Sequence, residues 1–369
     1  MKKIGIITLN GYFNYGNRLQ NFALQEILKS YNFEVETLWI KRSQTKKREN
    51  VLKRFLKVFL KPVNVAQRTK KILFPDKNKA KRIKRFKEFS NQYINESNYI
   101  ISEQNLHEDI LNTFDFFVTG SDQVWNPFYI KGSSLFFLTF APIEKRISYA
   151  ASFGVSEIPK EHVENYKKWL SEMENISVRE QDGVDIVKRL TNRNVPELID
   201  PTLLISREDW LTITKEAKNK PKKEILLTYF LGKIPKSTQK IINKYKREYK
   251  LTIVNLANPK YKKHYLTDPA EFLDYIYSAR LFFTDSFHGA LFSILFETPF
   301  IVTNRKSKTP SMNSRIETLL TKFNLKSRHI DNFDDKDIMN VDFSHTSEVL
   351  KNERRRAFKY LRNSLKKQR

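Results

Sequence analysis

The sequence contains no cysteine, few glycines and no long apolar run, and each shortage excludes a class of protein. Without cysteine the chain can hold no disulfide, no thiolate zinc site and no thiol nucleophile. Nine glycines in 369 residues are far too few for a collagen-like chain. No segment approaches the roughly 18 uncharged apolar residues of a membrane-spanning helix, and the apolar run 4–9 is too short for a signal peptide. We therefore expect a cytoplasmic protein.

Acidic residues are scarce in two segments, and this scarcity produces most of the net charge of +26. Residues 41–89 contain 19 Lys and Arg but 3 Asp and Glu, and residues 351–369 contain nine basic residues and one acidic residue. Together the two segments carry +24, so the rest of the chain is nearly neutral. The positive charge is therefore concentrated in a patch.

Within the first basic segment, residues 51–61 have the pattern of a basic amphipathic helix. Its apolar side holds Leu52, Phe55, Leu56 and Phe59, and its basic side holds Lys53, Arg54, Lys57 and Lys61. Such a helix suits an anionic membrane surface, where each basic residue adds about 1 kcal/mol. An ordinary surface helix is the alternative. No zinc-finger spacing, phosphate-binding lysine loop or RNA-binding aromatic strand accompanies the charge, so we expect no nucleic acid partner.

Apolar and aromatic residues are abundant, at 40% and 13%, which excludes a disordered chain. Strand-like and helix-like runs alternate almost throughout, as in parallel α/β sheets. The expected strands are 4–9, 34–40, 114–120, 146–152, 175–179, 224–230, 251–256, 281–284 and 300–303. The expected helices are 18–30, 161–173, 182–190, 237–248, 269–278, 286–296 and 348–367.

This order predicts an α/β fold in which two Rossmann-like doubly wound domains face a cleft. The N-terminal domain is expected at residues 1–205, with a basic helical insertion at about 41–95. The C-terminal domain is expected at 206–340 and begins with a polar linker at 206–223. A basic C-terminal helix is expected at 341–369. Ligands of such sheets bind beyond the carboxyl ends of the strands, so the candidate site residues lie in strand-to-helix junctions.

The first junction, residues 9–20, offers Asn14, Tyr15 and Asn17. Its backbone N–H groups and helix N-terminus suit an anion or a sugar, and a structural turn with Asn as the helix cap is the alternative. The second junction, residues 118–127, offers Asp122, Gln123 and Trp125. Asp and Gln suit sugar hydroxyls and a Trp face suits a sugar ring, whereas a polar turn with a packed Trp is the alternative.

Two further junctions offer candidates for binding an anion and for moving a proton. Arg179 ends the third junction and could hold a carboxylate or phosphate with two hydrogen bonds, unless it is a surface ion-pair partner of Glu180. The fourth junction contains Ser286, Phe287, His288 and Gly289. Helix capping explains the serine but not a histidine in the first helical turn, so His288 is the candidate general acid.

Seven motifs in order resemble the polysaccharide pyruvyl transferase family over about residues 1–320. They are the Asn-Tyr-Gly loop and helix at 14–25, Gly-Ser-Asp-Gln-Val-Trp-Asn at 120–126, Tyr-Ala-Ala-Ser-Phe-Gly at 149–154, Ser-Val-Arg-Glu at 177–180, Asp-Pro-Thr-Leu-Leu at 200–204, Asp-Ser-Phe-His-Gly-Ala at 285–290 and Ser-Arg-Ile-Glu at 314–317. The basic segment 41–89 lies outside these motifs.

The resemblance implies a fold like that of GT-B glycosyltransferases, with phosphoenolpyruvate as donor and a pair of glycan hydroxyls as acceptor. It implies that Arg179 and His288 are the principal donor-site residues, with N–H donors from the helix start at 286–289. The acceptor side is expected at Asn14, Tyr15, Asn17, Asp122, Gln123 and Trp125. No metal and no cofactor are expected, because no ligand cluster is visible in the sequence.

Two competing functions stay open from the sequence. One is a nucleotide-sugar glycosyltransferase of the same fold, which would need an acidic residue for the ribose. The other is a non-enzymatic basic protein that binds membrane or nucleic acid. A lipid-linked glycan acceptor would explain the basic segments, because peripheral contact with the inner face of the cell membrane would hold the enzyme beside its substrate.

Overall fold

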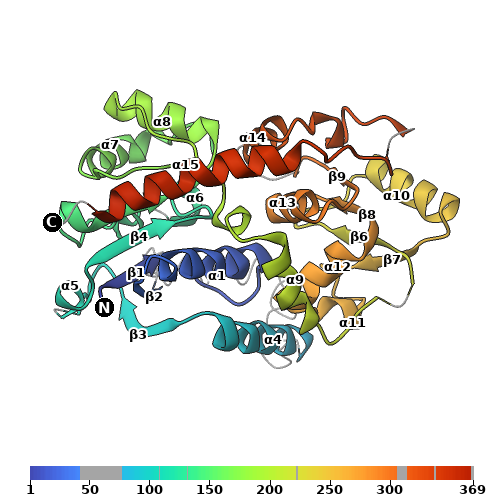
Figure 1. The fold of residues 1–369 in the computed structure, drawn as a ribbon, viewed down its shortest axis with the longest axis horizontal. Coiled ribbons are helices and arrows are strands. Elements are labelled where there is room, and N and C mark those ends of the chain that lie inside the picture. Colours follow the sequence, from blue (N-terminus) through green and yellow to red (C-terminus); the bar gives the residue numbers. More distant parts are fainter. Residues whose placement is uncertain are drawn as a thin grey trace, which may run out of the picture.

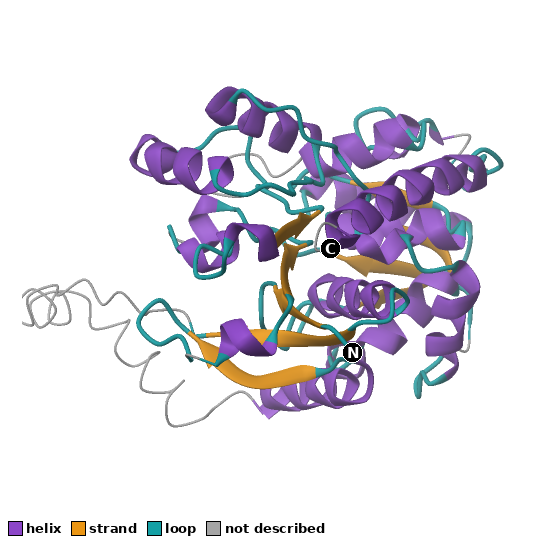
Figure 2. Cartoon of the chain, turned by 60° about the vertical axis from the view of Figure 1, so that its left-hand side comes forward, coloured by secondary structure: helices purple, strands orange, loops and turns teal. Residues whose placement is uncertain are grey.

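The computed structural model describes residues 1–41, 77–107, 109–130, 132–221, 223–305, 314–335 and 338–366. Two separate sheets, each made of parallel strands, organise the chain (Figure 1). Figure 2 shows helices packed around both sheets. The predicted α/β fold with two parallel sheets is confirmed, and the predicted boundaries of the two domains stay a prediction.

The first sheet has the strand order β3-β2-β1-β4-β5. Its strands are β1 (Lys3–Ile7), β2 (Glu34–Ile40), β3 (Glu96–Ile101), β4 (Phe116–Gly120) and β5 (Arg146–Tyr149). The helices of this part are α1 (Tyr15–Lys29), α4 (Lys77–Tyr93), α5 (Ile110–Thr113), α6 (Pro127–Ile130), α7 (Val163–Ser171) and α8 (Gln181–Thr191). Both β1 and β4 are buried along nearly their whole length, as expected for central strands of a parallel sheet.

The second sheet has the strand order β7-β6-β8-β9. Its strands are β6 (Ile225–Tyr229), β7 (Thr252–Asn255), β8 (Ala279–Thr284) and β9 (Phe300–Val302). The accompanying helices are α9 (Arg207–Lys215), α10 (Lys236–Glu248), α11 (Lys262–Tyr265), α12 (Pro269–Tyr277), α13 (Phe287–Phe296), α14 (Ser314–Lys322) and α15 (Thr346–Lys366). Every residue of α13 is buried, because this helix lies in the interior of the molecule.

One apolar core joins the two sheets. It contains residues of β1 and β4 together with residues of β6, α12 and α13. Tyr15 of α1 lies in this core, where its ring stacks on Phe272 of α12 at 4.3 Å between centroids. The C-terminal helix α15 extends over both halves (Figure 1). Its Glu353 pairs with Lys322 of α14 at 2.9 Å, and its Tyr360 donates to the carbonyl of Ser148 in β5. The two halves are therefore packed together over a continuous interior.

Three sequence predictions differ from the structure. Residues 206–223, predicted as a polar linker, contain α9, whose Trp210 is fully buried against Phe22 and Phe292. The segment 175–179, predicted as a strand, forms only isolated bridges at Asn175 and Val178. Strand β3 was not expected, because it lies at the edge of its sheet and only its last residues are strongly apolar.

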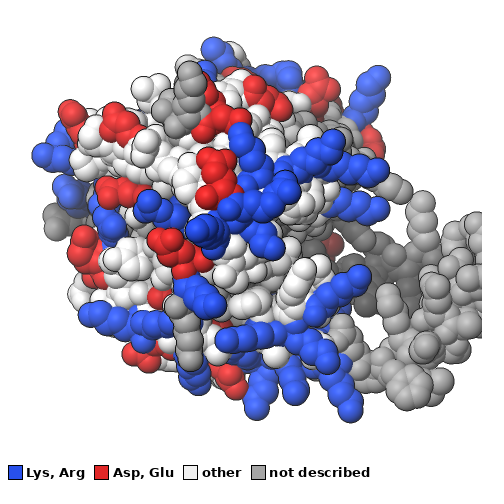
Figure 3. Space-filling view, turned by 90° about the vertical axis from the view of Figure 1, so that its right-hand side faces the viewer, with Lys and Arg blue, Asp and Glu red and all other residues white. Residues whose placement is uncertain are grey.

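The described basic residues lie mostly on solvent-facing helix surfaces. The exposed basic residues of α4 are Lys77, Lys79, Lys81, Lys84 and Lys87, and those of the outer face of α15 include Lys351, Arg355, Lys359, Arg362 and Lys366. In Figure 3, Lys and Arg are mixed with acidic residues above and predominate toward the bottom of the view, the height of α4 and α11 in Figure 1. The predicted amphipathic helix at 51–61 lies outside the described residues, so membrane contact stays a prediction. In the part of the chain that is described, no helix has the length and apolarity to cross a membrane.

Candidate functional site

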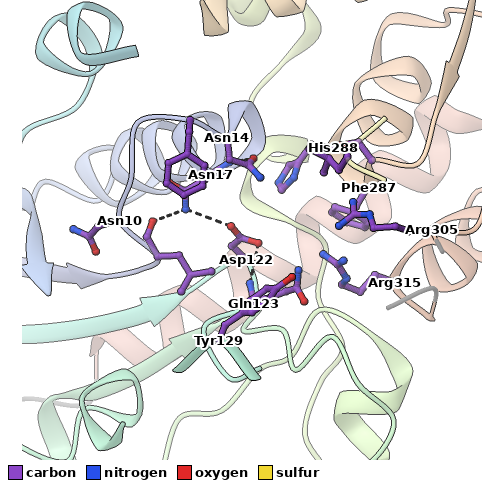
Figure 4. Close-up of a pocket in the computed structure, with 14 residues that line it drawn as sticks. Asn10, Asn14, Asn17, Asp122, Gln123, Tyr129, Phe287, His288, Arg305 and Arg315 are labelled. Carbon is purple, nitrogen blue, oxygen red and sulfur yellow. Dashed lines mark hydrogen bonds between the residues drawn. The ribbon is translucent and has the colours of Figure 1, made fainter. Parts of the chain in front are cut away.

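A pocket of about 270 Å³ lies where the carboxyl ends of both sheets meet, near the small end of the range for small-molecule sites. The loops that follow β1 and β4 form one wall, and the loops that follow β6, β8 and β9 form the other together with the start of α14 (Figure 4). The lining residues are Leu9, Asn10, Phe13, Asn14, Asn17, Asp122, Gln123, Tyr129, Leu231, Ser286, Phe287, His288, Arg305 and Arg315. Parallel sheets place ligand sites at this end of their strands, so the pocket is the candidate active site.

The start of α1 forms part of the first wall. Asn14 caps this helix, because its Oδ1 accepts the N–H of Asn17 at 3.1 Å. Asn17 in turn donates from Nδ2 to the carbonyl of Leu9 and to Oδ2 of Asp122. Asn14 and Asn17 line the pocket as predicted, but Tyr15 does not. Tyr15 is fully buried and its hydroxyl donates to the carbonyl of Thr267, so it is a core residue and the acceptor role predicted for it is wrong.

The loop after β4 supplies the only carboxylate among the described residues that line the pocket. Gly120 has a φ of +151° and its Cα approaches the carbonyl of Tyr149 so closely that a side chain would collide with it. Asp122 follows with a φ of +57°, and its Oδ1 accepts the N–H of Gln123 at 2.9 Å. This left-handed backbone directs the carboxylate of Asp122 toward the pocket (Figure 4).

Trp125 in the same loop does not reach the pocket, so the prediction that it contacts a sugar ring is wrong. The indole is fully buried, lies parallel to the ring of Phe137 at 5.2 Å and donates from Nε1 to the carbonyl of Phe136. The alternative interpretation of a packed tryptophan is the correct one. Asp122 and Gln123 do line the pocket, as predicted.

The junction between β8 and α13 forms the second wall. Ser286 caps α13 by accepting the N–H of Gly289, as the capping pattern predicted. Gly289 itself faces away from the pocket, since a side chain there would press on Thr284 and Phe282. His288 lies against the start of α1, where any side chain at Gly16 would collide with the imidazole. The first turns of α1 and α13 therefore meet at His288.

A buried network of charges lies behind His288. The carboxylate of Asp200 is 2.7 Å from Nη1 of Arg179 and 3.5 Å from Nε2 of His288. It also accepts hydrogen bonds from the hydroxyls of Ser121 and Thr202, both at 2.7 Å. Burial raises the pKa of Asp200, but His288, Arg179 and these hydrogen bonds more than offset it and hold the pKa well below its ordinary value of 3.8.

Arg179 is thus part of the site rather than of the surface. Its side chain is nearly completely buried, and among the described residues its Nε and Nη2 atoms have no hydrogen-bond acceptor, although Nη2 lies 4.0 Å from Oδ1 of Asp122. The alternative of a surface ion pair with Glu180 is wrong, because Glu180 is buried and accepts the N–H groups of Phe153 and Gly154. The guanidinium of Arg179 lies behind Phe287, with Cζ 4.5 Å from the ring centroid, and does not itself line the pocket.

Two arginines of the pocket were not among the predicted site residues. Arg305 donates from Nη2 to the carbonyl of Asp285 at 3.2 Å. Arg315 is 6% exposed, and its Nε has no acceptor among the described residues. Burial and the nearby charge of Arg179 lower the pKa of Arg315 to about 10. The motif at 314–317 could have indicated Arg315, and Asp200 likewise begins a motif, whereas no sequence signal distinguished Arg305.

The pocket therefore has two chemically different walls. One wall presents amides and a single carboxylate from Asn14, Asn17, Asp122 and Gln123. The other presents His288, Arg305 and Arg315, with Arg179 behind them. Within the described ranges, no group of three His, Asp or Glu residues is placed to hold a metal ion. The geometry suits a small anion on the cationic wall and a hydroxylated molecule on the other.

Two parallel α/β sheets facing a pocket at their carboxyl ends define a protein of the GT-B type. The fold is similar to that of UDP-GlcNAc 2-epimerase from Neisseria meningitidis bound to UDP-GlcNAc, with a TM-score of 0.50, 9% identity and coverage of 97% of this chain and 94% of that chain. ADP-heptose lps heptosyltransferase II from E. coli matches with a TM-score of 0.33, 9% identity and coverage of 96% and 99%. A comparison with curated protein sequences finds no match.

The sequence profile described as polysaccharide pyruvyl transferase matches residues 14–307. This range includes both walls of the pocket except Leu9, Asn10, Phe13 and Arg315. The chain belongs to the polysaccharide pyruvyl transferase family, as its motifs predicted.

The network around Asp200 makes stability depend on pH. Because its folded-state pKa is depressed, Asp200 stabilises the protein above the unfolded pKa near 4, and this contribution is lost as the pH falls below that value. Asp200→Asn leaves Arg179 and His288 without their counter-ion, so we expect the free energy of unfolding at pH 7 to fall by about 3–5 kcal/mol. Urea denaturation at pH 7, 5 and 3 measures it. The difference in free energy of unfolding between the wild type and Asp200→Asn should shrink toward pH 3. Asp331→Asn, at an exposed position, is the control. A difference that does not change with pH would contradict the electrostatic cause.

The lowered pKa of Arg315 indicates that keeping this buried side chain charged lowers the stability of the folded protein. Arg315→Met removes this charge, so we expect the melting temperature of the free protein to rise by about 2–4 °C. Inorganic phosphate should raise the melting temperature of the wild type but not that of the variant, because the anion loses a cationic partner. Arg280→Met, on the exposed side of β8, is the matched control. A variant that is less stable and responds normally to phosphate would refute this interpretation.

Proposed function

We propose that the protein transfers the pyruvyl group of phosphoenolpyruvate to two hydroxyls of a glycan and forms a pyruvate ketal. The observation that carries this proposal is the placing of His288 between the Asp200 network and a pocket wall with Arg305 and Arg315. Phosphoenolpyruvate carries a phosphate and a carboxylate, and arginines are the side chains best suited to bind both. Family membership supports polysaccharide pyruvyl transfer.

The reaction requires a protein group that gives a proton to the carbon–carbon double bond of phosphoenolpyruvate. Protonation of the methylene carbon makes the neighbouring C2 electrophilic, so that a sugar hydroxyl can add to it and phosphate can leave. His288 lines the pocket, and the carboxylate of Asp200 lies 3.5 Å from its Nε2, an arrangement that orients an imidazole for proton transfer. Arg315 and Arg305 line the pocket and would hold the anionic groups, and Arg179 behind Phe287 would add positive charge to this wall.

The opposite wall suits the acceptor. Asn14, Asn17, Asp122 and Gln123 offer hydrogen-bonding groups that match sugar hydroxyls. Beyond Phe13 and Leu231 the cleft continues into a second groove that shares both residues, which leaves room for the rest of a glycan. A nucleotide-sugar donor is less well supported, because no described carboxylate lines the wall formed by the loops after β6 and β8.

Replacement of His288 tests the proton donor. We expect His288→Gln and His288→Ala to reduce phosphate release from phosphoenolpyruvate, measured with a panel of acceptor glycans, by about 10²–10⁴-fold. Circular dichroism should show an unchanged fold, and exposed His107→Ala should keep full activity. Wild-type turnover in the glutamine variant would remove His288 from the mechanism.

Replacement of Arg179 by lysine tests the donor-binding role. Lysine keeps the charge but cannot face both Asp200 and Asp122 with a planar fork, so the cationic wall should lose its form and the affinity for phosphoenolpyruvate should fall about tenfold to a hundredfold. Isothermal titration gives the affinity, and exposed Arg189→Lys on α8 is the matched control. Equal affinities of variant and wild type would show that Arg179 only supports the fold.

A further inference from the structure

The proposed transfer needs a group that removes protons from the acceptor. Each of the two hydroxyls loses its proton when its oxygen bonds to C2 of the pyruvyl group. Over the whole reaction one proton is gained by the methylene carbon, which becomes a methyl group, and one leaves with the phosphate. His288 on the cationic wall gives a proton to carbon, so the hydroxyl protons require a base on the acceptor side. This step rests on the proposed function.

Asp122 is the carboxylate placed for this task. Of the described residues that line the pocket, it alone has an acidic side chain. The other buried carboxylates nearby are already engaged and do not line the pocket. Asp285 accepts the N–H groups of Leu231 and Gly232, and Glu180 accepts those of Phe153 and Gly154. Asp200 is surrounded by Arg179, His288 and two hydroxyls.

The surroundings of Asp122 fix the carboxylate but do not saturate it. Oδ1 accepts the N–H of Gln123 at 2.9 Å and lies 4.0 Å from Nη2 of Arg179, and Oδ2 accepts Nδ2 of Asn17 at 3.3 Å. A carboxylate has about four lone-pair positions, so each oxygen can accept a further proton donor from the pocket. The left-handed φ of +57° is uncommon for a residue other than glycine, and such backbone is found where a side chain must be aimed.

The position of Asp122 relative to His288 also fits the proposed reaction. In Figure 4 it lies between Asn17 on one wall and Arg315 on the other, and His288 lies across the pocket from it. A donor on the cationic wall would therefore have its electrophilic carbon between the acid that protonates it and the base that activates the acceptor.

We propose that Asp122 is the catalytic base that deprotonates both acceptor hydroxyls in turn. As the first hydroxyl attacks, its O–H bond breaks, the electron pair forms the C2–O bond and the proton passes to Asp122. When the bond between C2 and the phosphate oxygen breaks, the electron pair leaves on the phosphate, which takes this proton from Asp122. The second hydroxyl then attacks C2 and gives its proton to Asp122, from which it passes to solvent and replaces the proton that His288 gave to carbon.

Asp122→Asn tests the base. Asparagine accepts left-handed backbone readily and keeps an oxygen for the N–H of Gln123, so the loop should keep its form. We expect kcat for phosphate release with a competent acceptor to fall about 10²–10⁴-fold. Phosphoenolpyruvate should bind no more weakly than to the wild type, because the substitution removes a negative charge 4.0 Å from Nη2 of Arg179. The acid limb of the pH profile of kcat/KM should disappear in the variant, because a base is inactivated by protonation. Asp185→Asn, exposed on α8, is the matched control.

The results separate three outcomes. Loss of kcat and of the acid limb with intact donor binding supports the proposal. A higher KM for the glycan with unchanged kcat and an unchanged pH profile would show that Asp122 only binds the acceptor, and would overturn it. Failure of the wild type to bind phosphoenolpyruvate, or to release phosphate from it with any glycan, would overturn the proposed function and the base together, and is recognised before the variant is made.

Discussion

The buried carboxylate of Asp200 is the interaction on which the candidate site depends. Its partners come from separate parts of the chain: Ser121 after β4, Arg179 before α8, Thr202 beside it and His288 at the start of α13. Arg179 and His288 are themselves buried, so each charge would be costly without the others. The network therefore forms only when the loops of both sheets are in place, and with it the pocket is complete.

The apolar core that joins the two sheets also holds the residues around Asp200 in place. Tyr15 and Gly16 are neighbours in α1, yet the first is stacked in the core on Phe272 and the second leaves space for the imidazole of His288. Any displacement of α1 against α12 would consequently move the surface on which His288 rests. Close-packed interiors resist such displacement, so the core fixes the position of His288 in the pocket.

The sequence predicted much of this arrangement because strand-to-helix junctions have a recognisable pattern. Parallel strands bring their carboxyl ends to one edge, so the junctions containing Asn14 and Asp122 are neighbours in the first sheet, and His288 joins them because the second sheet faces the first across the pocket. The pattern could not tell which aromatic residues of these junctions face inward, and both Tyr15 and Trp125 are core residues. Arg305 follows β9 without any motif, and only the pairing of β8 with β9 brings it to the pocket. The helix α9 was missed because most of its residues are polar, and Trp210, Ile213 and Thr214 are its buried residues.

The two walls of the pocket also differ in how completely their polar groups are satisfied. On the wall formed by the loops after β1 and β4, Asn14, Asn17 and Asp122 hydrogen-bond to one another and to backbone, so this wall is held in shape without a ligand. On the cationic side, nitrogens of Arg179 and Arg315 have no acceptor in the described part of the chain. Buried donors without partners destabilise a fold, and an anion that enters the pocket would supply the missing acceptors. In the proposed function, a donor anion would therefore tighten the cationic wall as it binds, while the acceptor would meet a wall that is already formed.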